Sequence, residues 1–285
     1  MKKSKKGAVM LSMVLAASTI LSGSVSAAVK NPVKDLKPNK VYSYDVDKDG
    51  IKDKVKYTFS EKDSAVRIYI NDKLAKKVQL DKETQFYDAK MQIADIDKSD
   101  KTMDFWIYGF AFSDDICFSS LYEFKGKKLT KIFENKCKEV NENLTLSQGT
   151  LYSTDGKGFF DVQMDRAFFC DYITGNHWDR IPYQLKSGKV TRKDASYYQF
   201  TANLTIDGKG KYIAAEKLTF TKKPGGKETA FTLKKGGKVT ALQLYAKKNG
   251  ELFVQYKNAD GKKGWLAAKD YTFDNQPFTN SLFAG

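Results

Sequence analysis

Residues 44–59, "YDVDKDGIKDKVKYTF", place four aspartates within nine residues, directly before a strand pattern. Counted from the first of them, aspartates hold positions 1, 3, 5 and 9, a glycine holds position 6, and position 7 offers a backbone carbonyl. This is the order of oxygen ligands in calcium-binding loops. Four carboxylates this close repel one another unless a cation neutralises them. The pattern therefore predicts a structural Ca²⁺ site with these ligands: Asp45, Asp47, Asp49, Ile51 and Asp53.

The residues around this loop exclude an EF-hand. That motif needs a bidentate glutamate at position 12, where this chain has Lys56, and it needs flanking helices. Strand patterns flank this loop instead. Two interpretations remain: a calcium loop between two strands, or an acidic turn that binds no metal.

A second acidic loop, "DIDKSDKTMD", begins 50 residues after the first. Asp95, Asp97 and Ser99 hold positions 1, 3 and 5, but Asp100 replaces the glycine and the closing acid, Asp104, comes one residue late. Aspartate can adopt the left-handed turn conformation, so the loop can still close. Whether it binds metal is left open. A third loop, "STDGKGFFD", has a lysine at position 5 that would repel an ion, and we expect only a turn there.

The segments between these loops predict an all-β fold. Apolar and polar residues alternate in "KVKYTF", "AVRIYI", "MDFWIYGFAF", "FFDVQM" and "ELFVQY", and turn sequences such as "NDK", "KGKK" and "KSGK" separate them. Each acidic loop is followed by two to four strands that end in a lysine-rich hairpin. A period near 50 residues with about four strands per unit is typical of propeller blades. Three units are few for a closed propeller, so we expect an incomplete propeller or an open stack of sheets.

The C-terminal part has a different character. About five short strands lie close together, with glycine-rich turns at "PGG" and "KKGGK" and a hairpin, "NADGKKGW", that ends in a tryptophan. This density of short strands predicts a small closed barrel, with its boundary near residues 207–211.

Two motifs carry a resemblance to known families. "DVDKDGIKD" resembles the calcium loop of FG-GAP or VCBS-type repeats, which form the blades of integrin-like β-propellers, and "GKKGWL" resembles the Gly-Trp strand of bacterial Src-homology-3-like domains. Together with the N-terminal segment, the chain looks like secreted Gram-positive VCBS-repeat proteins. The resemblance implies extracellular scaffolding, structural calcium in the blades, and a barrel that contacts cell-wall peptide or glycan. The later loops depart from the motif, so only the first carries over as a full ligand set.

The N-terminus is read as a secretory signal peptide. "MKKSKK" is basic, the following residues are apolar or small, and "SVSAA" offers a cleavage site after Ala27. A membrane anchor is the alternative, but the apolar run is shorter than the roughly 20 residues that span a bilayer. We therefore expect a secreted or cell-wall-associated protein with no transmembrane span in the mature chain, divided into residues 1–27 (signal peptide), 28–208 (β-repeats) and 209–285 (barrel).

The net charge of +15 favours polyanionic partners. Nucleic acid is a poor partner for an exported chain, which leaves a cell-wall polymer, a glycan or a surface protein. A merely solvated lysine surface is the alternative.

Three cysteines leave at least one thiol unpaired. With residues 126–128 as a three-residue hairpin loop, the register sets Cys117 opposite Cys137, close enough for a disulfide. We predict this pair if a disulfide forms, with Cys170 free.

The sequence offers little for catalysis. There is one histidine, His177, and its nearest thiol is that of Cys170, which in one hairpin is more typical of packing than of a nucleophile. A glycosidase needs only two carboxylates, and no pair stands out. We therefore expect a non-catalytic attachment protein at the cell surface. The alternative is a secreted glycan-active enzyme or its carbohydrate-binding accessory module. The ligand and the oligomeric state stay open.

Overall fold

The computed structural model describes residues 32–282 except 82, 112–114, 142–143, 166, 169, 194, 204 and 207, and only the backbone of 141 and 200–203. The predicted signal peptide lies outside these residues. Almost all regular structure in the described part is strand, so the all-β prediction is confirmed. The described segments include one short α-helix, α1 (Asp171–Thr174), and one 3₁₀ turn, η1 (Ala268–Asp270).

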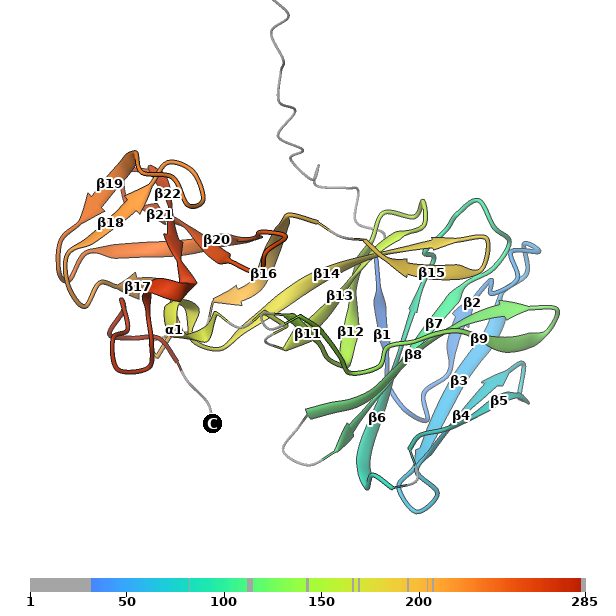
Figure 1. Ribbon diagram of the computed structural model, residues 1–285. Helices are drawn as coiled ribbons and strands as arrows, with labels where there is room; N and C mark the ends of the chain where they lie inside the picture. Colours follow the sequence, from blue (N-terminus) through green and yellow to red (C-terminus); the bar gives the residue numbers. More distant parts are fainter. Residues whose placement is uncertain are drawn as a thin grey trace, which may run out of the picture.

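Three antiparallel four-stranded meanders follow one another along the chain (Figure 1). The first consists of β2 (Tyr42–Tyr44), β3 (Asp53–Ser60), β4 (Ala65–Ile70) and β5 (Lys73–Gln79). The second consists of β6 (Phe86–Ala94), β7 (Asp104–Ala111), β8 (Asp115–Lys125) and β9 (Lys128–Glu134), with β1 (Lys34–Leu36) added beside β6. The third consists of β12 (Gly149–Thr154), β13 (Phe159–Asp165), β14 (His177–Lys186) and β15 (Lys189–Arg192). Between the last two lies a small ribbon of β10 (Lys138–Asn141) and β11 (Leu144–Leu146).

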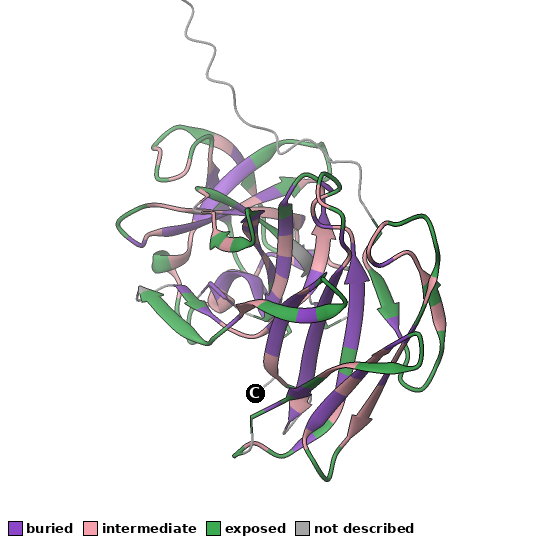
Figure 2. Ribbon diagram, turned by 90° about the vertical axis from the view of Figure 1, so that its right-hand side faces the viewer, coloured by how far each residue is buried: buried purple, intermediate pink, exposed green. Residues whose placement is uncertain are grey.

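The second meander is buried on both faces. Successive side chains of a strand point to opposite faces, and along β7 Phe105 and Ile107 belong to the core shared with the first meander. Trp106 and Tyr108, one residue out of phase, belong to the core shared with the third. The three sheets therefore stack as layers with the second in the middle. Figure 2 shows the buried residues concentrated in the strands and the exposed residues in the turns.

The C-terminal unit continues this sheet system. β16 (Tyr197–Asn203) pairs with β14 through its last residues and with β20 (Lys238–Ala246) through its first. From there the sheet order runs through β21 (Leu252–Asn258), β22 (Lys263–Ala267), β18 (Leu218–Thr221) and β19 (Thr229–Leu233), while β17 (Tyr212–Ile213) also pairs with β20. None of the described sheets closes into a barrel, because β19 pairs only with β18. The expected boundary near residues 207–211 falls in the loop between β16 and β17.

The hairpin that contains the cysteines differs from the prediction near its turn. Lys125 pairs with Lys128, so the turn has two residues, Gly126 and Lys127, instead of three. Both have positive φ, 58° and 65°, as a type I′ hairpin turn requires. A β-bulge between Leu121 and Tyr122 then shifts the register by one residue. Beyond the bulge the strands have the register expected from the sequence.

Candidate metal centre

The first acidic loop, which joins β2 to β3, is shaped by its own carboxylates. Asp45 accepts hydrogen bonds from the N–H of Asp49 (3.0 Å) and of Gly50 (2.9 Å), one on each oxygen. Asp49 in turn accepts from the N–H of Ile51 at 2.7 Å. Gly50 has φ +91°, which a side chain would strain. The chain thus bends around these side chains, as the predicted glycine position required.

Three of the predicted ligands come together. Asp45, Asp47 and Asp49 each present a carboxylate oxygen, and these oxygens lie within 4.8 Å of one another. Oδ1 of Asp47 is shielded from solvent and has no hydrogen-bond partner in the described part of the structure. A buried carboxylate oxygen without a partner is costly, because it has lost its water and gained nothing in exchange. A bound cation would satisfy this oxygen and offset the mutual repulsion.

The other two predicted ligands stand apart from this group. Asp53 uses one oxygen to accept the N–H of Val46 (3.2 Å) and the other to accept the side-chain amide of Asn71 (2.6 Å), so it closes the hairpin. It is not among the three residues whose oxygens converge. The side chain of Ile51 is exposed. That its backbone carbonyl binds a metal ion stays a prediction.

The second acidic loop joins β6 to β7 and already holds a positive charge. The ammonium of Lys48, a residue of the first loop, lies 3.0 Å from Oδ1 of Asp95 and 3.4 Å from Oδ1 of Asp100. The side-chain oxygens of Asp97 do not converge with these, since its Oδ1 accepts from the N–H (3.0 Å) and the hydroxyl (2.6 Å) of Ser99. Among the described residues, only the first loop brings three metal-ligating side chains together.

Asp104, the closing acid of the second loop, is fully buried. Its Oδ2 accepts the N–H of Ile96 at 3.0 Å, as Asp53 accepts the N–H of Val46 in the first loop. Burial raises the pKa of Asp104 to about 8, although the hydrogen bond from Ile96 opposes the shift. Oδ1 of Asp104 is buried without a hydrogen-bond partner in the described part of the structure, like Oδ1 of Asp47 in the first loop.

The three acidic hairpins lie side by side. The N–H of Met103 donates to the carbonyl of Val46 (3.0 Å), and the N–H of Gly158 donates to the carbonyl of Ile96 (2.8 Å). Val46 and Ile96 hold the same position in the first two loops. In the third loop the carboxylate of Asp155 accepts backbone N–H groups of its own turn, as a plain turn does. Each meander is thus joined to the next through its first hairpin.

A second polar cluster lies between the third meander and the C-terminal unit. Sγ of Cys170 lies 3.6 Å and Oδ2 of Asp179 3.2 Å from the same nitrogen of His177, Nε2, and all three side chains are buried. Burial opposes a charged imidazole, but the sulfur and the carboxylate raise the pKa of His177 well above its usual value. Burial also raises the pKa of the Cys170 thiol. Asp171 lies 3.7 Å from the far ring nitrogen, Nδ1. A catalytic triad also needs its nucleophile within reach of substrate, and the thiol of Cys170 is fully buried.

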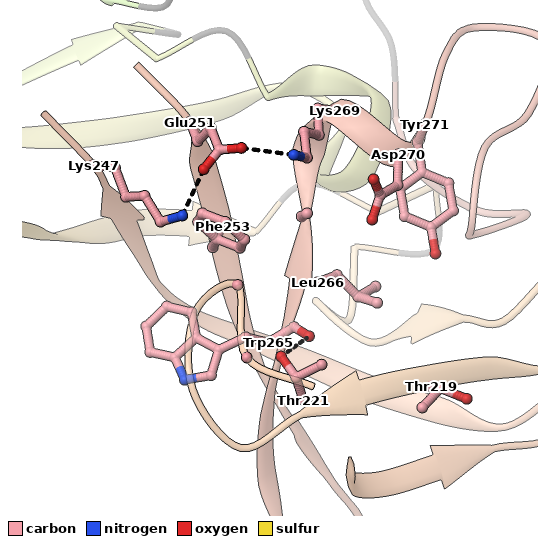
Figure 3. A pocket seen from close by; sticks show the side chains of 13 residues that line it. Thr219, Thr221, Lys247, Glu251, Phe253, Trp265, Leu266, Lys269, Asp270 and Tyr271 are labelled. Atoms are coloured by element: carbon pink, nitrogen blue, oxygen red, sulfur yellow. Dashed lines mark hydrogen bonds and ion pairs between the residues drawn. The ribbon is translucent and has the colours of Figure 1, made fainter. Parts of the chain in front are cut away.

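The C-terminal unit carries a cavity of about 470 Å³. Figure 3 shows Phe253 beside Lys247, whose ammonium lies 4.9 Å from the ring centroid, with Trp265 further along the lining. Glu251 binds Lys247 (2.5 Å) and Lys269 (2.6 Å). Ligand sites of comparable size combine aromatic surface with a few placed polar groups. The lining of this cavity likewise combines charged groups with aromatic side chains.

Sequence reasoning missed both Lys48 and this cavity. Lys48 is separated from Asp95 by 47 residues, and only the stacking of the hairpins brings them together. The Gly-Trp motif pointed to the strand of Trp265, but the network around Glu251 has no local signal.

No helix in the described part of the chain is long and apolar enough to cross a membrane. No protein family, curated protein or solved structure matches the chain.

Proposed function

We propose that this chain is an extracellular, non-catalytic β-repeat protein that binds Ca²⁺ in its first acidic loop and attaches to a polymer of the cell surface. The observation that carries the proposal is the convergence of Asp45, Asp47 and Asp49, together with the buried, unpartnered oxygen of Asp47. Calcium fits this donor set because it takes carboxylate and carbonyl oxygens in flexible geometry.

The repeated meanders support the interpretation as propeller-type blades of the FG-GAP or VCBS kind. Each begins with a hairpin that carries an acidic loop, and consecutive hairpins are hydrogen-bonded. In this proposal the ion has a structural role, since it relieves repulsion within the first hairpin and performs no reaction. The C-terminal unit, with its Gly-Trp strand, corresponds to the Src-homology-3-like domain.

Attachment is assigned to the C-terminal cavity. Lys269, whose side chain is exposed at the rim, suits an anionic group of the polymer. Phe253 and Trp265 line the cavity but are nearly buried, so they shape its wall. The net positive charge of the chain strengthens binding to an acidic polymer at low salt.

Calcium titration by calorimetry tests the first part of the proposal. The wild type should bind Ca²⁺ with a dissociation constant of about 10⁻⁴–10⁻³ M, which is typical of extracellular modules. Asp47→Asn should abolish this binding, and Asp155→Asn, in the third loop, should not. A wild type that binds no Ca²⁺ would refute the metal assignment.

Retention on purified cell walls tests the second part. Lys269→Glu, at the cavity, should reduce retention more than Lys54→Glu, an equally exposed and ion-paired lysine of the first meander. Raising the salt to about 0.5 M should release part of the bound protein, because exposed charges are then screened. Equal retention of the two variants would remove the cavity from the proposal. Turnover of a panel of cell-wall glycans would favour the alternative, a glycan-active enzyme.

A further inference from the structure

A lysine of the first acidic loop lies among the oxygens of the second. Nζ of Lys48 is 3.0 Å from Oδ1 of Asp95, 3.0 Å from the carbonyl oxygen of Asp100 and 3.4 Å from Oδ1 of the same residue. Asp95 holds position 1 of the second loop and Asp100 holds position 6. The ammonium therefore sits against two carboxylates and a carbonyl of one loop, all of them oxygen acceptors.

These contacts satisfy the ammonium completely. A lysine has three N–H donors, and three oxygens of the second loop accept them. The side chains of Lys48, Asp95 and Asp100 are only 22%, 23% and 29% exposed, so water screens this network less than it screens a surface ion pair. A divalent ion at the same place would meet the positive charge of Lys48 at close range.

The backbone directs the side chain to this place. Lys48 has φ +52°, a left-handed conformation that is uncommon for a residue with a side chain. It stands between Asp47 and Asp49, two residues of the candidate metal centre. The conformation of the first loop therefore sets where the ammonium reaches.

We propose that Lys48 is the resident cation of the second acidic loop. It keeps divalent ions out of that loop and fastens the first hairpin to the second. The chain thus has one loop for a metal ion and one loop that is neutralised by a side chain of its neighbour. The role of Lys48 in the second loop does not depend on the proposed function. An ion in the first loop would in addition hold Lys48 in position, and this part rests on the proposed function.

The count of bound Ca²⁺ ions tests this inference by calorimetry. Lys48→Met keeps the apolar stem and removes the charge, so this variant should bind one Ca²⁺ more than the wild type. Lys48→Arg keeps the charge and should bind the wild-type number. Lys54→Met, which removes an exposed lysine paired with Asp72 at 3.5 Å, is the matched control and should also bind the wild-type number. An unchanged count in Lys48→Met, or an added ion in Lys48→Arg, would overturn the inference.

A further substitution separates this inference from the proposed function. Asp95→Asn combined with Lys48→Met should remove the added ion and leave any ion in the first loop. If the wild type binds none and Lys48→Met binds one that Asp95→Asn removes, the inference holds and the calcium assignment of the first loop fails. If the wild type binds one ion and Lys48→Met binds no more, the calcium assignment of the first loop holds and the inference about Lys48 fails.

The fastening role has a readout that needs no metal. In chelator, the melting-temperature shifts of Lys48→Met and Asp95→Asn should not add in the double variant, because each substitution breaks the same contact. Additive shifts would show that the two side chains do not act together.

Discussion

The N–H of Gly158 donates a hydrogen bond to the carbonyl of Ile96, and through this bond the third hairpin is joined to the second. The carbonyl of Gly158 in turn accepts the N–H of Leu185 at 2.7 Å. The glycine has φ +92°, and a methyl group on its Cα would collide with the carbonyl oxygen of Leu185. The turn of the third hairpin can lie this close to β14 of its own meander only because Gly158 has no side chain.

Gly158→Ala should therefore destabilise the chain by more than backbone strain alone. Gly50→Ala is the matched control, since its φ is +91° and nothing lies within 4 Å of an added methyl group. Both variants carry the strain of a positive φ, and only Gly158→Ala adds a steric clash, which typically costs about 1–3 kcal/mol. Urea unfolding in chelator measures the difference. Equal losses in the two variants would show that the close approach does not matter for stability.

Asp47→Asn should make the thermal stability independent of calcium. At millimolar Ca²⁺ and a dissociation constant of about 10⁻⁴–10⁻³ M, binding stabilises the folded state by about 0.4–1.4 kcal/mol. Chelation should therefore lower the melting temperature of the wild type by a few degrees without unfolding it. Asp155→Asn should keep this response. A wild type that melts identically with calcium and with chelator would mean that the first loop is only an acidic turn.

Asp104→Asn should change how stability depends on pH. The pKa of Asp104 is raised by burial to about 8, from 3.8 for an ordinary aspartate, so between these values the folded chain binds a proton that the unfolded chain does not. The contribution of this carboxyl to stability is thus fully present below about pH 4 and is lost as the pH rises toward 8. Asparagine keeps an oxygen that can accept the N–H of Ile96 and carries no charge.

The wild type should therefore lose more stability than Asp104→Asn between pH 5 and pH 9. Between pH 5 and pH 9 the stability of the variant relative to the wild type should rise by about 1 kcal/mol or more, because each pKa unit corresponds to 1.36 kcal/mol. Urea denaturation across this pH range provides the measurement. Parallel curves for the two proteins would contradict the assignment of Asp104 as a buried neutral acid.

In oxidised protein, the disulfide should link Cys117 to Cys137. All three cysteines are free thiols in the structure. Ser120 pairs with Glu134 beyond the bulge, and the same register continued for three residues sets Cys117 against Cys137. Cys170 is buried beside His177, so an oxidant reaches it last. Peptide mapping after mild oxidation tests this pairing, and a bridge to Cys170 would exclude it.

The sequence predicted what depends on local pattern. Alternation located most strands, and the spacing of aspartates located all three acidic hairpins. It could not predict what depends on contacts between distant segments. Asp53 and Asp104 look alike in the sequence, yet one is partly exposed and the other fully buried, because only the second meander is covered on both faces.

The predictions that failed also depend on contacts that the local pattern does not contain. Alternation with Leu244 predicts that Leu242 lies in the core of the C-terminal unit, but a bulge between Ala241 and Gln243 leaves it half-buried. Alternation cannot predict the two-residue turn after Lys125 or the bulge that compensates for it. The residues on each side of the turn fit a two-residue turn and a three-residue turn equally well. The expected barrel has the expected strands, and what it lacks is the pairing that would close it.

β16 also has a mechanical consequence. Its residues Tyr197–Gln199 are paired with β20, and its later residues are paired with β14. In the proposed attachment, the C-terminal unit holds a surface polymer and the repeats lie at the other end, so the junction between them is loaded in tension. A pull between the two ends therefore loads the ladders of β16 together with the hydrogen bonds that Tyr212 and Tyr256 donate to the carbonyls of Thr174 and Ile173. The two parts separate only if the ladders of β16 and these contacts around α1 break together.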